Sequence, residues 1–244
     1  MCIFLFVACA KTSVTTDEGD FFQNKIMSRS VNLSSFEYPA IQWSAFDTHE
    51  QKVAACEIPD SILPNIPTEE LVEICMEYPL LFDAYAFDSP LEGIKKVVSQ
   101  FNGFKELMDR TDNCSCLFRY LKNNDVRNVN FTLLTNVEEG TFLLRYSFCE
   151  YLLAFDNILN NSTEELKEEI SSFVYEILEN KELDRQHYAL SGLSSSVYLW
   201  ASILSNNRRQ TRATNTTIDK FLEQGIILNI EEYLKIKQAC QTYN

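Results

Sequence analysis

The sequence predicts an all-α protein, and three observations support this fold class. Apolar residues recur at helical spacing along most of the chain. Glycine and proline are scarce, at six residues each, so long stretches lack the turn residues that separate the short strands of a sandwich or barrel. Apolar residues make up 45% of the chain, which is enough to bury a core. Because the helical units differ in length and share no repeated signature, we expect an irregular stack of antiparallel helices; a solenoid-like arrangement remains open.

The N-terminal residues are expected to direct the chain to the cell envelope. Residues 2–10 form an apolar run that is too short to span a bilayer but suits the h-region of a signal peptide. Phe6-Val7-Ala8-Cys9 resembles a bacterial lipobox, so we predict a signal peptide over residues 1–9 and lipidation of Cys9. Phenylalanine replaces the usual leucine and no basic residue precedes the run; a start codon assigned too late would explain the second departure. An unmodified Met1 on the mature protein, detected by mass spectrometry, would contradict this prediction.

The rest of the chain divides into a tether and a domain. Residues 10–35 are polar and lack regular periodicity, which is typical of a flexible tether. Residues 36–244 are expected to form a single helical domain. Its first helix should begin after Thr48, because Thr48 and Gln51 form the pattern of a capping box.

The stretch from Thr68 to Arg110 predicts consecutive amphipathic helices. Thr68 precedes two glutamates, so its hydroxyl should cap a helix whose apolar stripe ends at Tyr78-Pro79. Residues 80–87 are almost wholly apolar and predict a short buried helix.

Two short polar motifs punctuate the second half of this stretch. Ser89-Pro90 predicts a new helix, because proline is tolerated in a first turn. Asn102-Gly103 predicts the end of that helix, since these residues adopt the left-handed conformation at low cost.

This central stretch also resembles a known family. The string IPDSILPNIPTEELVEICMEYPLLFDAYAF, followed by QFNGFKEL, is similar to uncharacterised, predicted secreted or lipid-anchored proteins of gut Bacteroidales. The matching features are Ile58-Pro59, the Thr-x-x-Leu-Val of Thr68 to Val72, Tyr78-Pro79, and Phe101-Asn102-Gly103 before Glu106-Leu107. The resemblance covers Glu37 to Leu121, about a third of the chain. Because that family has no assigned activity, the resemblance implies an envelope location and a helical fold, and no catalytic residue.

Further helices are predicted downstream. Residues 125–136 alternate apolar and polar side chains and predict a brief strand or extended loop. Residues 138–156 form a strongly apolar helix, the candidate for the central one. Ser162 and Glu165 have the spacing of a capping box, which predicts the start of another helix. Residues 191–205 predict a further helix, and Asn229 is expected to cap the last one.

The sequence offers few groups for catalysis. The only two histidines, His49 and His187, lie outside any recognisable motif and are expected to be solvated or locally hydrogen-bonded. Cys114-Ser115-Cys116 would point its thiols to nearly opposite faces of a helix, which excludes shared metal ligation. After Cys2 and Cys9, six cysteines remain; their pairing stays open, and we expect mostly free, buried thiols. We find no nucleotide, calcium or serine-hydrolase motif and expect no catalytic residue, metal or cofactor.

Two surface features could serve recognition or modification. Arg208, Arg209 and Arg212 form a basic cluster that is a candidate contact for an acidic partner or lipid headgroups; an exposed loop is the favoured interpretation. Asp60-Ser61-Ile62 resembles the O-glycosylation site of Bacteroidales periplasmic proteins, which makes Ser61 a candidate acceptor, although Asp60 is more simply the start of a helical turn.

Three functions agree with these features. We favour an envelope lipoprotein of the periplasm or outer membrane, anchored through its N-terminal lipid, that binds an envelope protein or peptide without catalysis. The alternatives are an envelope hydrolase that acts on glycan or peptide through dispersed carboxylates, and a periplasmic binder of small molecules that uses exposed tyrosines and phenylalanines. A net charge of −14 argues against general nucleic-acid binding.

Overall fold

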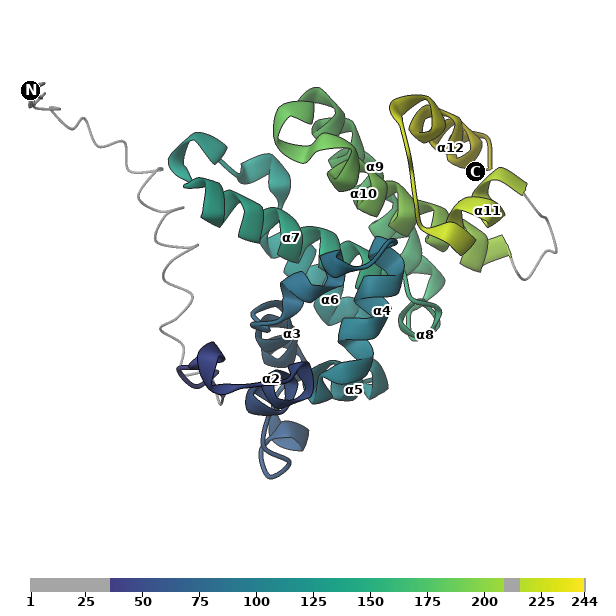
Figure 1. Cartoon of the computed structure of the whole chain (residues 1–244). Helices are drawn as coiled ribbons and strands as arrows, with labels where there is room; N and C mark the ends of the chain where they lie inside the picture. The colour runs from purple at the N-terminus through teal and green to yellow at the C-terminus, as the bar shows by residue number, and fades with distance from the viewer. Residues whose placement is uncertain (1–35, 209–215, 244) are drawn as a thin grey trace, which may run out of the picture. The chain divides into compact units, whose positions relative to one another are not determined.

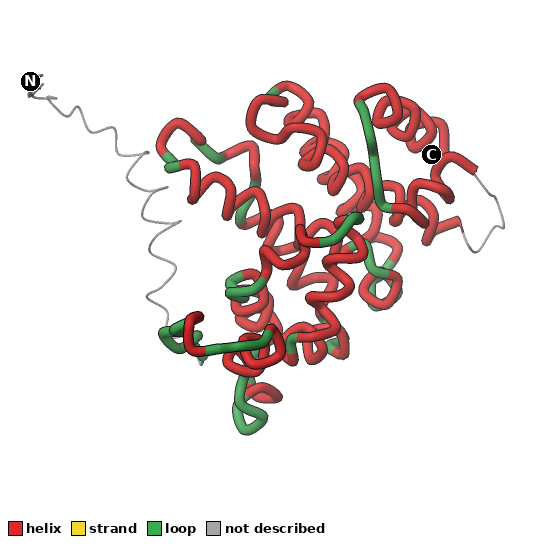
Figure 2. The backbone as a smooth tube through the Cα atoms, in the orientation of Figure 1, coloured by secondary structure: helices red, strands yellow, loops and turns green. Residues whose placement is uncertain are grey.

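The structure, a computed structural model, describes residues 36–208 and 216–243. Within these ranges it contains α-helices, 3-10 helices and loops but no strand, which confirms the all-α fold class (Figure 2). The predicted signal peptide, Cys9 and the tether lie outside the described residues.

The α-helices follow one another through the domain (Figure 1). They are α2 (His49–Cys56), α3 (Thr68–Met76), α4 (Pro90–Gln100), α5 (Asn102–Asp109), α6 (Asn113–Asn123), α7 (Asn136–Leu153), α8 (Asp156–Leu159), α9 (Glu164–Leu183), α10 (Arg185–Arg208), α11 (Thr216–Gln224) and α12 (Ile230–Tyr243). The 3-10 helices are η2 (Trp43–Ala45), η3 (Leu63–Asn65), η4 (Leu81–Ala86), η5 (Val126–Asn128) and η6 (Phe131–Leu133).

The core is organised around α7 and α10. Helix α10 packs along α9 and α7 and also contacts α8, α11 and α12. Helix α7, the predicted central helix, contacts α3, α4, α6 and α8 as well. Because these contacts join elements far apart in the sequence, they build one core instead of a linear array in which each unit contacts only its neighbours.

Several helix ends agree with their predicted caps. Thr48 and Gln51 form the capping box of α2, Ser89 caps α4, and the Asn229 side chain accepts a hydrogen bond from the Glu232 N–H at 2.9 Å. A second capping box, between Thr135 and Glu138, starts α7. The preceding residues, predicted as a strand or loop, form the two short turns η5 and η6.

Two predicted caps are wrong, because one polar side chain has a more distant partner and the other competes with a neighbour. Thr68 does not cap α3: its hydroxyl donates to Asp112 Oδ1 at 2.7 Å. The cap of α9 is Thr163, one residue after Ser162, whose hydroxyl donates to the Leu159 carbonyl instead. In both cases, the spacing of residues along the sequence does not reveal which group caps the helix.

Helix α4 ends at Gln100, close to the predicted stop at Asn102-Gly103, but Asn102 itself begins α5 and Gly103 does not adopt the left-handed conformation. Its side chain accepts from the Ile58 N–H at 3.0 Å and donates to the Ile58 carbonyl at 2.7 Å. The next position requires glycine, because a Cβ at Gly103 would lie 2.4 Å from the Phe101 ring. The two hydrogen bonds of Asn102 therefore hold the start of α5 against the segment that follows α2.

Candidate functional site

The 3-10 helix η4 carries an exposed aromatic face. In a 3-10 helix, residues three apart share a face, so Leu81 and Ala84 point into the core while Phe82 and Tyr85 point outward. Phe82 is 57% exposed and Tyr85 is 55% exposed. The prediction of a buried helix over residues 80–87 is therefore wrong for this face, because the helix has three residues per turn and only one face meets the core.

Helix η4 lies against α4 through Gly93. A Cβ at Gly93 would lie 1.8 Å from the Ala84 carbonyl oxygen and 2.6 Å from its carbon, so only glycine permits this approach. The close contact fixes the position of the exposed aromatic side chains.

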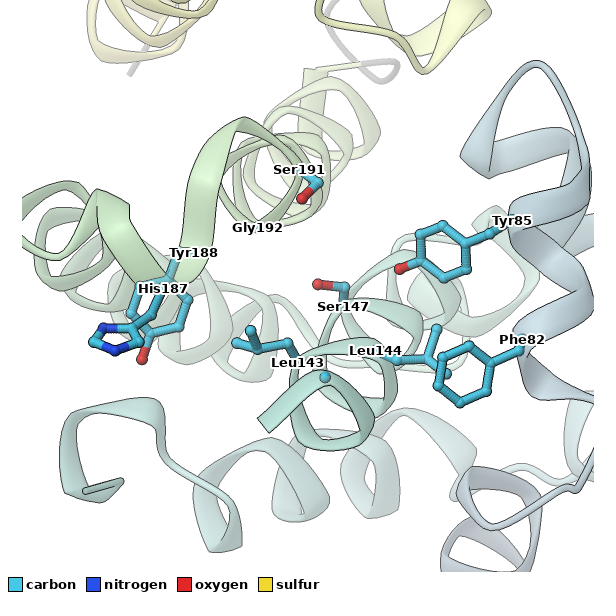
Figure 3. A pocket seen from close by; sticks show the side chains of 10 residues that line it. Phe82, Tyr85, Leu143, Leu144, Ser147, His187, Tyr188, Ser191 and Gly192 are labelled. Carbon is cyan, nitrogen blue, oxygen red and sulfur yellow. The ribbon is translucent and has the colours of Figure 1, made fainter. Parts of the chain in front are cut away.

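Two apolar hollows lie beside η4, α7 and α10, and we call them together the aromatic cleft. Figure 3 shows the first of them, which we call the His187 hollow. Each has a volume of about 240 Å³. The His187 hollow is lined by Phe82, Tyr85, Gly140, Leu143, Leu144, Ser147, His187, Tyr188, Ser191 and Gly192. The Ile226 hollow is lined by Tyr85, Pro90, Ser147, Tyr151, Leu190, Ser191, Ser194, Gly225, Ile226 and Ile227.

Three hydroxyl-bearing residues mark the junction of the two hollows. Tyr85, Ser147 and Ser191 line both hollows and come from η4, α7 and α10 respectively. Figure 3 shows their hydroxyl ends turned toward the space between these elements. Among the described residues, none of the three hydroxyls has a hydrogen-bond partner. An apolar hollow with a few converging polar groups is the usual form of a ligand site.

Helix α10 is broken at the cleft wall by Ala189. This residue has φ 47° and ψ −163°, a conformation that is nearly restricted to glycine. The break separates Arg185–Tyr188 from the longer segment that starts at Leu190, and residues on both sides line the cleft. Backbone strain of this kind gathers at functional sites.

Replacing Ala189 with glycine is expected to raise the free energy of unfolding by about 1 kcal/mol. The strain of a non-glycine residue in this region costs about 1–3 kcal/mol, and the extra chain entropy of glycine offsets part of the gain. The control is Ala54→Gly in the regular part of α2, where the same change should cost about 1 kcal/mol. If urea denaturation showed that both variants lose the same free energy of unfolding, backbone strain at Ala189 would be contradicted.

Behind the cleft wall lies a buried ion pair between α7 and α9. Lys181 Nζ donates to the Glu150 carboxylate at 2.9 and 3.0 Å, and both side chains are 1% exposed. Ser195 and Ser196 of α10 donate to the same carboxylate at 2.5 and 2.6 Å. Lys181 also donates to the Gly192 carbonyl at 3.2 Å. The cluster therefore joins three helices through one satisfied polar network.

The geometry of this cluster favours a structural role. Lys181 Nζ lies 2.9 Å from Ser196 Oγ, the spacing of a serine–lysine nucleophile pair. However, Ser196 is fully buried and its hydroxyl donates to Glu150. Burial lowers the pKa of Lys181, while the Glu150 carboxylate opposes that shift. Neither Lys181 nor Ser196 lines the aromatic cleft, so a substrate in the cleft would not reach them.

Several carboxylates influence Tyr188, which lines the His187 hollow. Burial, followed by the carboxylates of Asp184 and Glu150, raises the pKa of Tyr188. Asp125 and Glu139 add to this effect. Glu150 pairs with Lys181 and Asp125 pairs with Arg127, whereas Asp184 lies beside His187.

The predicted candidates lie apart from one another. His49 lies 3.6 Å from Asp83 and 3.4 Å from Gln100; His187 lies 2.8 Å from Asp184 and stacks on Phe131. His187 is therefore locally hydrogen-bonded, as predicted, and only it lines the cleft.

None of the remaining candidates among the described residues lines the cleft. Arg208 is the last residue of α10, and Arg209 and Arg212 lie outside the described residues. Ser61 is exposed in a turn before η3. The six cysteines of the domain are free and buried, and burial raises their pKa values. In the described ranges, no group of three or more metal-ligating side chains comes together.

Sequence reasoning missed the cleft and the ion pair for different reasons. Phe82 and Tyr85 are three residues apart, and this spacing was the available signal for the exposed face of η4. Glu150 stands alone in an apolar helical run, which indicates a buried carboxylate that needs a partner. Its partner, 31 residues away, has no local signature.

The comparisons add no family. No helix among the described residues is long and apolar enough to cross a membrane. Comparison with protein-family models, curated proteins and solved structures finds no match, so the resemblance to Bacteroidales proteins stays a prediction and the function must be argued from the site.

Proposed function

We propose that this chain is a cell-envelope protein that binds a peptide segment of a protein partner in the aromatic cleft. The observation that carries this proposal is the pair of apolar hollows that meet at three unpartnered hydroxyls among the described residues. Two hollows of this size accommodate two apolar side chains of one extended peptide. The hydroxyls between them supply hydrogen bonds for the peptide backbone.

The charge around the cleft defines the partner further. The carboxylates of Asp184 and Glu139 contribute to the raised pKa of Tyr188, which lines the His187 hollow, and the whole chain has a net charge of −14. A peptide with lysine or arginine next to its apolar residues therefore complements the site, and an acidic peptide is repelled.

The hydrolase alternative receives less support from this geometry. No carboxylate lines either hollow, and Glu150, the nearest buried one, is held by Lys181 and two serines. A pair of carboxylates facing each other is the minimum for glycoside hydrolysis by the common mechanisms. The small-molecule alternative is retained as an outcome of the experiment below.

Blocking the cleft at Ser191 is expected to abolish peptide binding. Random heptapeptides at the free C-terminus of a carrier protein are selected on the wild-type domain, and enriched sequences are synthesised and measured by fluorescence anisotropy. We expect two apolar residues and at least one basic residue in the enriched peptides. Ser191→Trp should weaken their binding by at least about tenfold, because the indole fills the junction of both hollows.

The matched control is Ser172→Trp on the exposed face of α9, which should leave binding unchanged. Enrichment of peptides that bind both variants equally would contradict the proposed site. If no peptide is enriched while a small aromatic compound binds in a Ser191-dependent way, the small-molecule function replaces this proposal.

The envelope location is part of the proposal. It rests on the apolar run over residues 2–10 and on the lipobox-like Phe6-Val7-Ala8-Cys9, with Cys9 as the lipidated residue. An anchored domain would hold the cleft at the membrane surface, where segments of other envelope proteins are accessible.

A further inference from the structure

We propose that the junction of the aromatic cleft binds the C-terminal carboxylate of the peptide, with the last side chain of the peptide in the Ile226 hollow. This inference deepens the proposed function and rests on it. It names the part of the partner that the site recognises: a free chain end that follows an apolar residue.

The first support is the start of a helical segment at the junction. Because Ala189 breaks α10, the segment from Leu190 to Arg208 has its own N-terminus, and Leu190, Ser191 and Gly192 line the cleft. The first N–H groups of a helix lack intrahelical partners and carry the positive end of the helix dipole. Such termini bind carboxylates and phosphates.

The second support is independent of that helix. Ser147 belongs to α7, is 9% exposed and lines both hollows. Its Oγ points into the cleft (Figure 3) and has no partner among the described residues. The side chain is therefore mostly buried, and its hydroxyl is open to the cleft and available to donate a hydrogen bond to a ligand there.

The set of donors fits a carboxylate. The hydroxyls of Tyr85, Ser147 and Ser191 can each donate one hydrogen bond, and a carboxylate accepts several without donating any. No acidic side chain lines the junction to compete with it. Hydrogen bonds to a charged acceptor are about twice as strong as those between neutral groups.

The surroundings also give the peptide a direction. The Ile226 hollow is walled by Pro90, Ile226 and Ile227 and suits the final apolar side chain. The His187 hollow, with Asp184 and Glu139 nearby, suits the preceding residues and their basic neighbours. The chain end therefore lies at the junction, and the rest of the peptide leaves past His187.

The test uses one peptide enriched in the selection, made with a free C-terminal carboxylate, with a C-terminal amide and with an added Gly-Ser-Gly. We expect the free carboxylate to bind the wild-type domain at least about tenfold more tightly than the other two forms. Ser147→Ala should reduce this ratio to about threefold or less, whereas Ser172→Ala, on exposed α9, should preserve it.

Each result has a distinct meaning. Equal binding of all three forms overturns this inference and leaves peptide binding in the cleft standing, whereas failure of every peptide overturns the proposed function itself. A carboxylate preference that Ser147→Ala does not change also overturns the inference. If decanoate displaces the peptide and binds more tightly than it, the carboxylate ligand is a lipid and the peptide assignment is wrong.

Discussion

Replacing Lys181 with methionine is expected to lower the free energy of unfolding by about 3–5 kcal/mol, a large share of the stability of a domain of this size. The substitution keeps the apolar volume but leaves the Glu150 carboxylate buried without its cation. Ser195 and Ser196 would still donate to that carboxylate, but two neutral hydroxyls do not replace a full positive charge. Chemical denaturation followed by circular dichroism measures the loss.

The decisive control is the double variant Glu150→Leu with Lys181→Met. Removing both charges leaves no uncompensated ion, and Ser195 and Ser196 already approach the Gly192 carbonyl at 3.2 and 3.4 Å. The double variant should therefore be more stable than Lys181→Met alone. If the double variant lost as much unfolding free energy as Glu150→Leu and Lys181→Met lose together, the ion pair would not act as a unit.

Replacing Gly93 with alanine is expected to cost about 3 kcal/mol or more. The added methyl group would lie 1.8 Å from the Ala84 carbonyl oxygen, which belongs to the backbone and cannot rotate away. This clash can be removed only if η4 moves away from α4. We therefore expect a loss of unfolding free energy at or above the upper end of the usual cost of overpacking a core. Because η4 carries Phe82 and Tyr85, the same variant should lose peptide binding.

Gly140 provides the matched control for this experiment. It lies inside α7, and a Cβ there would meet no atom within 4 Å. Gly140→Ala should therefore stabilise the domain by about 0.5–1 kcal/mol through reduced chain entropy. Similar urea midpoints for Gly93→Ala and the wild type would contradict the close packing of η4 against α4.

The parts of the fold that depend on local chemistry were predictable from sequence. The cap at Thr48 and the cap at Asn229 each involve a side chain and a backbone N–H within one turn, so the spacing of residues indicates them. Ser162 and Thr163 are adjacent hydroxyls that compete for one cap, and here sequence spacing selected the wrong one.

The parts that depend on distant partners were not predictable. Asn102 has the local features of a helix end, but Ile58, 44 residues earlier, satisfies its side chain and makes it a helix start. The aromatic cleft has the same origin. Tyr85, Ser147 and Ser191 belong to three elements, and only the packing of η4, α7 and α10 brings their hydroxyls together.

The most direct test of the account is methyl NMR of the isoleucine residues during titration with the selected peptide. Ile226 and Ile227 line the cleft, whereas Ile74 in α3 and Ile170 in α9 lie in the buried core away from it. If the peptide binds in the aromatic cleft, the Ile226 and Ile227 methyl signals should show saturable shifts, with little change at Ile74 and Ile170. Unchanged signals from Ile226 and Ile227 under saturating peptide would contradict binding in the aromatic cleft.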